Sequence, residues 1–380
     1  MVLRQPVRVT LGLALACMLV TCAPPGVIPP TATVPPTAGP VAGVGVAPEP
    51  IPLPLSEPGP YRVGVREFTS HDATRDGREV GVRVWYPAVW PEGTTGKRAI
   101  RDAEPDRGAA PYPLILSSAK MGSTLALDVI THGFVWAGVT RIDTWDEYTA
   151  ELIEQPLDIL FALDRVGANP PQELEGMIDA QRCGVIGYSF DGYNALALSG
   201  ARVDPEFYRA QCAAANATAE AVLSVLPGRY QCALADDWEA FAAHAGEAIV
   251  TSEDGLWQPM TDPRIRAALP MAGEGWLLFG EEGLAAVDRP TLMIVSTGDI
   301  WYRENLLILE HLGTPDRALI SFVGEDHLMV YDPDMKARMA HFAVAFFGYH
   351  LQGRQDLAYY FSEGFVALHD DLAWGEYLGE

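Results

Sequence analysis

The sequence predicts an α/β fold, with a mostly parallel sheet of eight strands covered by helices on both faces. The first observation is that short apolar runs typical of buried strands alternate with stretches typical of helices. The second is size, because 380 residues with 49% hydrophobic content suffice for one large domain or two small ones. The predicted strands cover residues 61–68, 79–86, 113–117, 134–139, 183–188, 265–271, 291–296 and 318–323.

The strand at 79–86 alternates valine with other residues at Val80, Val82 and Val84, which predicts a half-exposed strand near a sheet edge. Helices are predicted at 155–166, 190–198, 303–312 and 335–351. An insert at about 203–262 follows the helix at 190–198 and contains helices predicted at 207–221 and 236–249. Ligands bind at the carboxyl ends of strands in open α/β sheets, so the insert is a candidate lid. The alternative is a surface elaboration without function.

The N-terminus has the features of a targeting segment. Arg4 and Arg8 precede an apolar stretch at 11–20, which is too short to span a bilayer as a helix. The sequence Leu-Val-Thr-Cys at 19–22 resembles a bacterial lipobox, although Thr21 stands where Gly, Ala or Ser is usual. We therefore predict a signal peptide over residues 1–22, lipidation of Cys22 and an exported, membrane-anchored protein. The alternative is a conventional secretory signal peptide that is cut nearby.

Residues 23–60 contain 13 prolines and no Lys or Arg, which predicts a disordered stalk ahead of a domain at 61–380. The chain carries 26 Lys and Arg against 50 Asp and Glu, for a net charge of −24. A charge of this sign argues against nucleic acid as a partner and against electrostatic docking on anionic lipid.

The positions of the cysteines predict different roles for them. Cys183 begins a predicted strand and is interpreted as a buried packing residue. Cys212 and Cys232 lie in the insert, and an exported protein permits a disulfide between them. No Cys-x-x-Cys or His-x-x-x-His spacing occurs, so the sequence predicts no metal site.

The sequence Gly-Tyr-Ser-Phe-Asp-Gly at 187–192 contains the candidate catalytic serine. It nearly matches the nucleophile elbow Gly-x-Ser-x-Gly, and it lies between a predicted strand and a predicted helix, as that motif requires. The turn exposes the serine hydroxyl at the top of a sheet, which makes Ser189 the candidate nucleophile of an α/β-hydrolase fold. Asp191 stands where the motif has its second glycine.

A serine hydroxyl needs a base, usually a histidine oriented by a carboxylate. Asp299 and His327 follow the seventh and eighth predicted strands, in the chain order Ser, Asp, His that this fold uses. Asp326 and Asp143 are alternative acids. Taken alone, Asp299 could be a helix N-cap and His327 a surface histidine, but all three positions fall at the same edge of the sheet.

The negative charge that develops on the substrate oxygen needs hydrogen-bond donors. One donor is predicted to be the backbone N–H of Phe190. The second should come from the loop at 118–123, where Met121 or Lys120 could serve.

The chain resembles bacterial secreted α/β-hydrolases of the platelet-activating-factor acetylhydrolase and dienelactone-hydrolase-like group over about residues 61–350. The resemblance implies ester hydrolysis by Ser189, His327 and an aspartate, without a metal or organic cofactor, on small or short-acyl esters. The segments that carry it lie at 82–88, 112–116, 131–135, 187–190 and 262–265.

Two departures from the family pattern affect the site. Members usually read Ser-His-Gly where this chain has Ser118-Ala119-Lys120, and Ser-Phe-Gly-Gly where it has Ser-Phe-Asp-Gly at 189–192. The first could misplace an oxyanion donor, whose loss costs roughly 3 kcal/mol. The second would oppose the oxyanion if Asp191 pointed into the site. The expected function is therefore a serine ester hydrolase. The alternatives are an impaired hydrolase-fold binding protein, or a peptidase or acyltransferase of the same fold.

Overall fold

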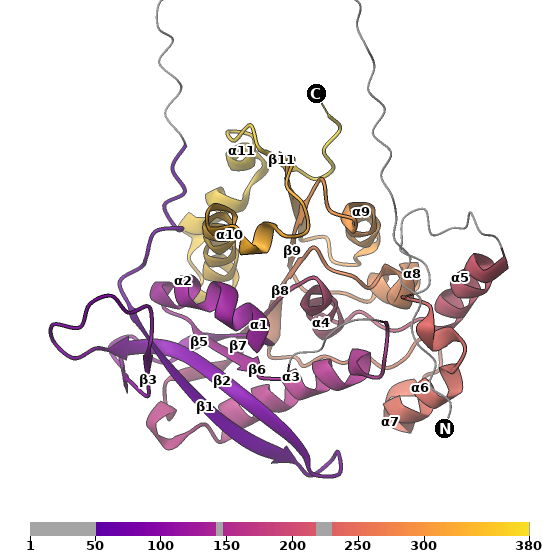
Figure 1. Ribbon diagram of the computed structural model, residues 1–380, viewed down its shortest axis with the longest axis horizontal. Coiled ribbons are helices and arrows are strands. Elements are labelled where there is room, and N and C mark those ends of the chain that lie inside the picture. Colours follow the sequence, from indigo (N-terminus) through magenta and orange to yellow (C-terminus); the bar gives the residue numbers. More distant parts are fainter. Residues whose placement is uncertain (1–50, 142–146, 218–229, 380) are drawn as a thin grey trace, which may run out of the picture. The chain divides into compact units, whose positions relative to one another are not determined.

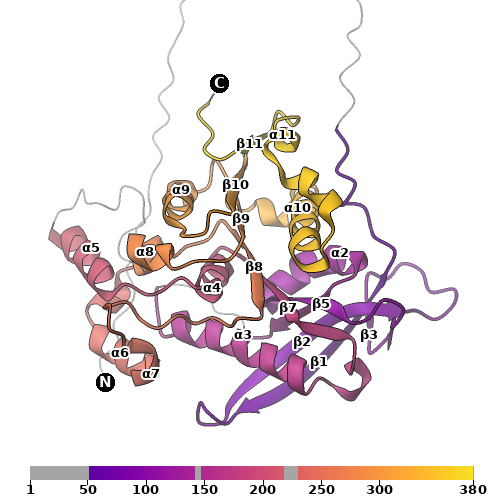
Figure 2. The ribbon, with the colours of Figure 1, turned by 180° about the vertical axis from the view of Figure 1, so that it is seen from behind.

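The computed structural model describes residues 51–141, 147–217 and 230–379. The predicted signal peptide, Cys22, the stalk up to residue 50 and Asp143 lie outside these residues. The described part contains one sheet with helices on both of its faces (Figures 1 and 2). Its strands are β1 (Arg62–Asp72), β2 (Arg78–Val89), β3 (Ile100–Arg101), β4 (Glu104–Pro105), β5 (Tyr112–Ser118), β6 (Val135–Val139), β7 (Ile178–Tyr188), β8 (Ile265–Met271), β9 (Thr291–Ser296), β10 (Arg317–Phe322) and β11 (Leu372–Trp374).

The sheet is mixed, and this corrects the prediction of eight mostly parallel strands. It has 11 strands in the order β11-β10-β9-β8-β7-β5-β6-β2-β1-β3, with β4 paired to β2. The run from β6 to β10 is parallel throughout, whereas β2 pairs antiparallel with β1, β4 and β6, and β11 pairs antiparallel with β10. All eight predicted segments coincide with strands. The three that were missed are two or three residues long, too short to show a periodic pattern.

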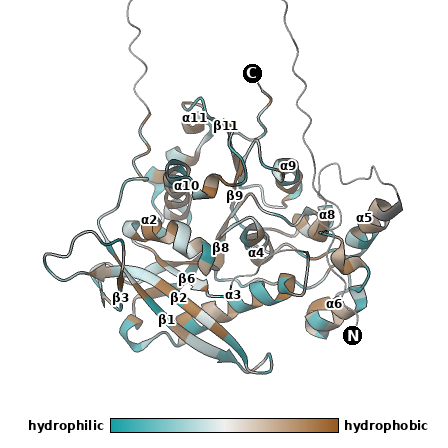
Figure 3. Cartoon of the chain, viewed as in Figure 1, coloured by the Kyte–Doolittle hydropathy of each residue, from teal (hydrophilic) through white to brown (hydrophobic). Residues whose placement is uncertain are grey.

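Helices cover both faces of the parallel run. The long helices outside the insert are α3 (Glu151–Ala168), α4 (Phe190–Leu198), α8 (Trp276–Ala285), α9 (Tyr302–His311) and α10 (Pro333–Gln352). Ile115 and Ile186 pack in the core that includes α10, whereas their neighbours Leu114 and Val185 pack in the core that includes α3. This alternation follows from the two-residue period of a strand. Along α3 the ribbon carries both hydrophobic and hydrophilic residues (Figure 3). Most of its buried residues are hydrophobic, and the buried polar ones are Gln155 and Asp158.

The insert contains α5 (Pro205–Ala217), α6 (Trp238–Ala245) and α7 (Glu247–Val250). The single helix predicted at 236–249 is broken at Gly246, whose φ of 84° is incompatible with a right-handed helix. A disulfide joins Cys212 to Cys232, and Trp238 packs against the rings of other aromatic residues of the insert. Tyr208, Trp238 and Trp257 belong to the same buried cluster as the main core, so the insert packs onto the body of the protein.

The packed part of the chain begins earlier than the predicted boundary at residue 61. Leu53 and Leu55 pack against the main core, and the backbone N–H of Leu55 donates to Nδ1 of His341 at 3.2 Å. Gly59 donates its N–H to Thr131 Oγ1 at 2.9 Å. Residues 51–60 therefore belong to the folded body rather than to a stalk.

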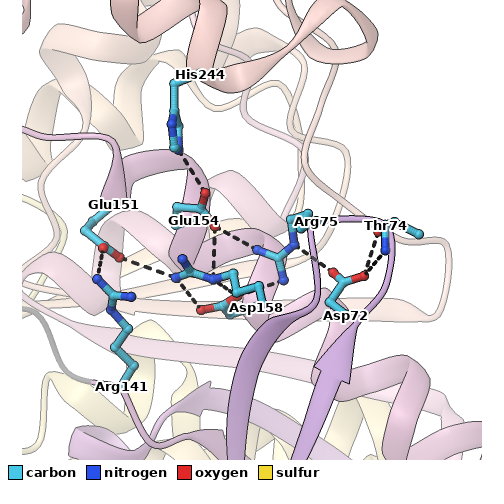
Figure 4. A network of polar contacts seen from close by, with 9 residues as sticks. Asp72, Thr74, Arg75, Arg141, Glu151, Glu154, Asp158 and His244 are labelled. Atoms are coloured by element: carbon cyan, nitrogen blue, oxygen red, sulfur yellow. Dashed lines mark hydrogen bonds and ion pairs between the residues drawn. The ribbon is translucent and has the colours of Figure 1, made fainter.

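A polar network joins the β1–β2 hairpin to α3 and the insert (Figure 4). Asp158 of α3 is 2% exposed and binds Arg78 through two hydrogen bonds, at 2.8 and 2.9 Å, and Arg75 at 2.7 Å. Glu154, one turn earlier on α3, binds both arginines and also His244 of α6 at 2.8 Å. A buried carboxylate is costly unless it is paired, so the two arginines permit α3 to lie against the hairpin.

We expect Arg78→Leu to lower the free energy of unfolding by about 2–3 kcal/mol, because it removes two charge-assisted hydrogen bonds from a buried carboxylate. Arg101→Leu is the matched control, since Arg101 pairs with Glu67 on the surface, where the loss should stay below about 1 kcal/mol. Urea unfolding of both variants measures the difference, and equal losses would contradict the assigned role of the network.

Candidate active site

The turn between β7 and α4 holds Ser189 in a strained backbone conformation. Its φ of 59° and ψ of −126° lie in a region that non-glycine residues rarely adopt. Its N–H donates to Met271 O in the neighbouring strand β8 at 2.9 Å, and its carbonyl accepts from Gly192 N at 2.7 Å. The backbone on both sides of the serine is therefore fixed.

Two glycines allow α4 to approach the sheet. A Cβ at Gly187 would overlap the carbonyl of Asp191, and one at Gly192 would lie 2.5 Å from the Cα of Gly273. Asp191 stands where the motif has its second glycine. The close contacts involve the backbone at 191 and the glycine at 192, so the aspartate side chain does not obstruct them.

The structure brings together Ser189, His327 and Asp299. Ser189 Oγ lies 3.0 Å from His327 Nε2, and His327 Nδ1 lies 2.8 Å from Asp299 Oδ2. Asp299 follows β9 and His327 follows β10, so both loops leave the carboxyl edge of the sheet. The Asp299 side chain is fully buried, whereas 28% of the His327 side chain is exposed. This arrangement can remove a proton from the serine hydroxyl.

Asp299 also holds the turn that precedes α9. Its Oδ1 accepts from the N–H of Trp301 at 2.8 Å, while Oδ2 faces the imidazole. The N-cap of α9 is Trp301, which has no side-chain cap bond, so Asp299 is not the helix N-cap that its position also allowed. Asp326 uses Oδ1 to accept from Leu328 N at 2.7 Å in an exposed turn, and the contact with His327 Nδ1 belongs to Asp299.

Tyr188 supports the histidine and was missed in the sequence. Its hydroxyl donates to the carbonyl of His327 at 2.8 Å, and the two rings lie 5.5 Å apart. Position 188 is the variable residue of the elbow motif, so no pattern marks it. The only signal was a large polar aromatic residue at the end of a strand expected to be buried.

The segment after β5 is helical, whereas a loop was expected at 118–123. It continues through α1 (Ala119–Met121), a π-helical turn (Gly122–Ala126), α2 (Leu127–Val129) and a final turn (Ile130–His132). Ser118 caps α1 by accepting from Lys120 N at 3.2 Å. Met121 is the third residue of α1, so its N–H belongs to the first turn, where amides have no intrahelical partner.

The two candidate oxyanion donors thus lie in the first turns of two helices. Met121 is in α1, which follows β5, and Phe190 begins α4, which follows β7. Strands β5 and β7 are parallel neighbours, so both helices start at the same edge of the sheet. Helix N-termini carry partial positive charge and favour an anion.

Asp191 has a defined partner. It is 4% exposed, and its Oδ2 accepts from the hydroxyl of Ser118 at 2.6 Å. Ser118 belongs to β5, on one side of β7, while His327 reaches Ser189 from the strands on the other side. The carboxylate is therefore directed to the opposite flank of the elbow from the imidazole.

Two further carboxyl groups, those of Glu274 and Glu304, are buried near Asp299. No sequence pattern predicted them. Glu304 is fully buried and accepts from the N–H groups of Gly275 and Trp276 at 2.8 and 2.9 Å. Burial raises the pKa of Glu304 to about 7. Burial, with the charge of Glu304 added to it, raises the pKa of Glu274 to about 8.

Within the described ranges, no three His, Cys, Asp or Glu side chains are grouped so that they could hold a metal ion. Across the same part of the chain, no helix combines the length and the apolar composition needed to cross a membrane.

No protein-family model and no curated protein matches the chain. Among solved structures, a ferulic acid esterase from Streptomyces cinnamoneus is similar, with a TM-score of 0.50 and 15% sequence identity. The match covers 83% of this chain and 97% of the esterase. At this identity the likeness shows the fold alone, which is a mixed α/β sheet with helices on both faces. The resemblance to the acetylhydrolase and dienelactone-hydrolase group therefore remains a resemblance.

We expect the free energy of unfolding to fall as pH rises from about 6.5 to 8. In this range the unfolded chain has already lost the protons of Glu274 and Glu304, whereas the folded chain still holds part of them, so stability declines by up to about 1.4 kcal/mol per pH unit for each proton held. The decline ends above about pH 8, where the folded chain has lost these protons as well. Histidines whose pKa is lowered by burial act below about pH 6.5 and do not contribute here.

Glu274→Gln should flatten this decline when urea unfolding is repeated across the pH range. Glu310→Gln is the control, because Glu310 is an exposed carboxyl on the same helix as Glu304. A variant at Glu274 that keeps the wild-type slope would contradict the assignment.

Proposed function

We propose that this chain is a serine hydrolase that cleaves small or short-acyl esters through an acyl-enzyme. The observation that carries the proposal is the series of hydrogen bonds from Ser189 through His327 to Asp299 at the carboxyl edge of the sheet. A strained nucleophile, a base within reach and a buried carboxylate behind it are the parts that acyl transfer needs.

In this mechanism Ser189 Oγ attacks the ester carbonyl while His327 Nε2 takes its proton. Asp299 holds the Nδ1–H of His327 and stabilises the imidazolium that forms. The oxyanion of the tetrahedral intermediate accepts from the N–H groups of Phe190 and Met121. The intermediate then collapses, and the leaving alcohol receives the proton from Nε2. Water repeats the same steps to release the acid and restore the serine.

Ester chemistry is favoured over peptide hydrolysis and acyl transfer by two likenesses. One is the resemblance to acetylhydrolase and dienelactone-hydrolase sequences, and the other is the similarity to a protein described as a ferulic acid esterase. We therefore propose a test panel of short p-nitrophenyl esters together with methyl ferulate. An added alcohol that diverts the acyl group from water would instead indicate an acyltransferase.

The competing proposal is a binding protein that has lost its chemistry. The sequence Ala119-Lys120, in place of His-Gly, favours it, because the segment that should supply an oxyanion donor departs from the family pattern. The two proposals differ in one outcome, which is whether Ser189 reacts covalently with a fluorophosphonate.

We also propose that the protein is exported and anchored by lipid at Cys22. The lipobox-like sequence supports the anchor, and the Cys212–Cys232 disulfide supports an oxidising compartment.

We expect Ser189→Ala to lower kcat for p-nitrophenyl acetate by at least about 1000-fold, because the nucleophile is removed, and to abolish fluorophosphonate labelling. Ser70→Ala in β1 is the control and should keep the wild-type rate. Undiminished turnover in Ser189→Ala would exclude the proposed mechanism, and a wild-type protein that is never labelled would favour the binding protein.

For the anchor, we expect the full chain expressed in a bacterial host to incorporate radiolabelled palmitate and to sediment with membranes. Cys22→Ser should abolish the label, since the thiol that receives the lipid is lost. Cys17→Ser, a change of the same kind five residues earlier, should retain it. Label in Cys22→Ser equal to that of the wild type would argue against lipidation at this residue.

A further inference from the structure

The two departures from the family pattern are in contact with each other. The Ser118 hydroxyl, at the start of the segment that reads Ser-Ala-Lys, donates to Asp191 at 2.6 Å. Both residues are almost fully buried, at 1% and 4% exposure. An O–H···O⁻ contact of this length is a charge-assisted hydrogen bond, about twice as strong as a neutral one. The aspartate in the elbow is thus bonded directly to the segment proposed to supply an oxyanion donor.

The bond fixes the direction of the Ser118 hydroxyl. An ionised carboxylate only accepts, so the hydroxyl proton is committed to Asp191. The hydroxyl oxygen then presents a lone pair to the N–H of Lys120, which lies 3.2 Å away. Because the Lys120 N–H donates to the Ser118 hydroxyl, the first turn of α1 is fixed. The N–H of Met121 follows one residue later, so its direction is set by that turn.

The same bond joins the two helices that carry the candidate donors. Asp191 is the second residue of α4, immediately after Phe190, while Ser118 is the N-cap of α1, which contains Met121. An oxyanion hole works only when both donors lie 2.7–3.1 Å from one point, and a misplacement of about 1 Å can cost about 100-fold in rate.

We propose that Asp191 is a positioning residue that holds α1 through Ser118, so that the N–H groups of Met121 and Phe190 converge on one oxyanion. This inference rests on the proposed esterase function and adds to it a part that the family pattern lacks. The aspartate fixes the segment after β5 by a side-chain hydrogen bond to Ser118.

The surroundings of Asp191 fit this role. Asn194 Nδ2 lies 3.4 Å from Oδ1 and donates at 2.7 Å to Gln155 of α3, so the second carboxylate oxygen also faces a donor. On the other side of α1's cap, Trp136 donates to the Ser117 hydroxyl at 2.7 Å, and that hydroxyl donates to the Ser118 carbonyl at 2.6 Å. These two bonds hold the carbonyl side of Ser118, and the bond to Asp191 adds the direction of the hydroxyl that caps α1.

The opposite reading is that Asp191 is a handicap, and the two readings predict changes of opposite sign. If the carboxylate only repels the oxyanion, Asp191→Gly restores the family glycine and raises kcat. If it positions α1, Asp191→Gly lowers kcat about 10- to 100-fold while KM for p-nitrophenyl acetate changes less than about 3-fold. Fluorophosphonate labelling should slow in parallel, because that reaction uses the same donors.

The experiment is a double-mutant cycle on the full chain. Asp191→Gly and Ser118→Ala should each lower kcat, and the double variant should be no slower than the slower single variant, because both break one bond. Asp191→Asn keeps an acceptor oxygen and should recover kcat to within about 3-fold of wild type. Asp334→Gly changes the same residue type at the second position of α10 and should leave kcat unaltered.

Three results would overturn the proposal. One is Asp191→Gly with kcat equal to or above wild type, and another is single losses that multiply in the double variant. The third is a wild type that neither hydrolyses esters nor reacts with the fluorophosphonate, which would remove the esterase function as well. The first two leave that function standing, so the failures are distinguishable. Should Asp191→Gly unfold, as shown by its thermal midpoint, Ser118→Ala and Asp191→Asn carry the same comparison.

Discussion

The close approach of α4 to the sheet determines the geometry of the whole site. At Gly187 the carbonyl of Asp191 occupies the space of a side chain, and Gly192 lies against Gly273 in the loop after β8. This backbone contact leaves no room for the chain between strand and helix to relax, so Ser189 is held at positive φ with its N–H bonded to β8. The base, the carboxylate and both candidate donors are placed relative to that fixed turn.

The buried carboxyl groups of this acidic protein differ in the groups that surround them. Asp158 is paired with two arginines, Asp299 shares its oxygens between an amide and an imidazole, and Asp191 accepts a serine hydroxyl. Burial raises the pKa of Glu274 and Glu304, although Glu304 accepts from two backbone N–H groups. These two carboxyls are therefore suited to hold protons near neutral pH.

Strand positions and the order of Ser189, Asp299 and His327 could be anticipated because both depend on local patterns: apolar runs, and polar residues just after them. Strands of two or three residues and the antiparallel partners of the sheet could not, since pairing direction is a long-range property. The helical form of the segment after β5 was missed because it consists of helical turns of only three to five residues each. The bond between Ser118 and Asp191 joins residues 73 apart in sequence, and no spacing marks it. The two departures from the family pattern, in the segment after β5 and at Asp191, are thus in contact with each other. Only the folded structure places them side by side.

The hydroxyl of Tyr188 fastens the backbone of His327 to the strand that ends at Ser189. The histidine loop leaves β10, which is separated from β7 by two other strands. Three neighbouring strand pairs lie between β10 and β7. Thermal displacements within each pair would therefore add up in the distance between these two strands. The Tyr188 hydroxyl links the His327 backbone directly to β7, across those pairs. This hydrogen bond opposes any change in the Ser189–His327 distance that such displacements would cause.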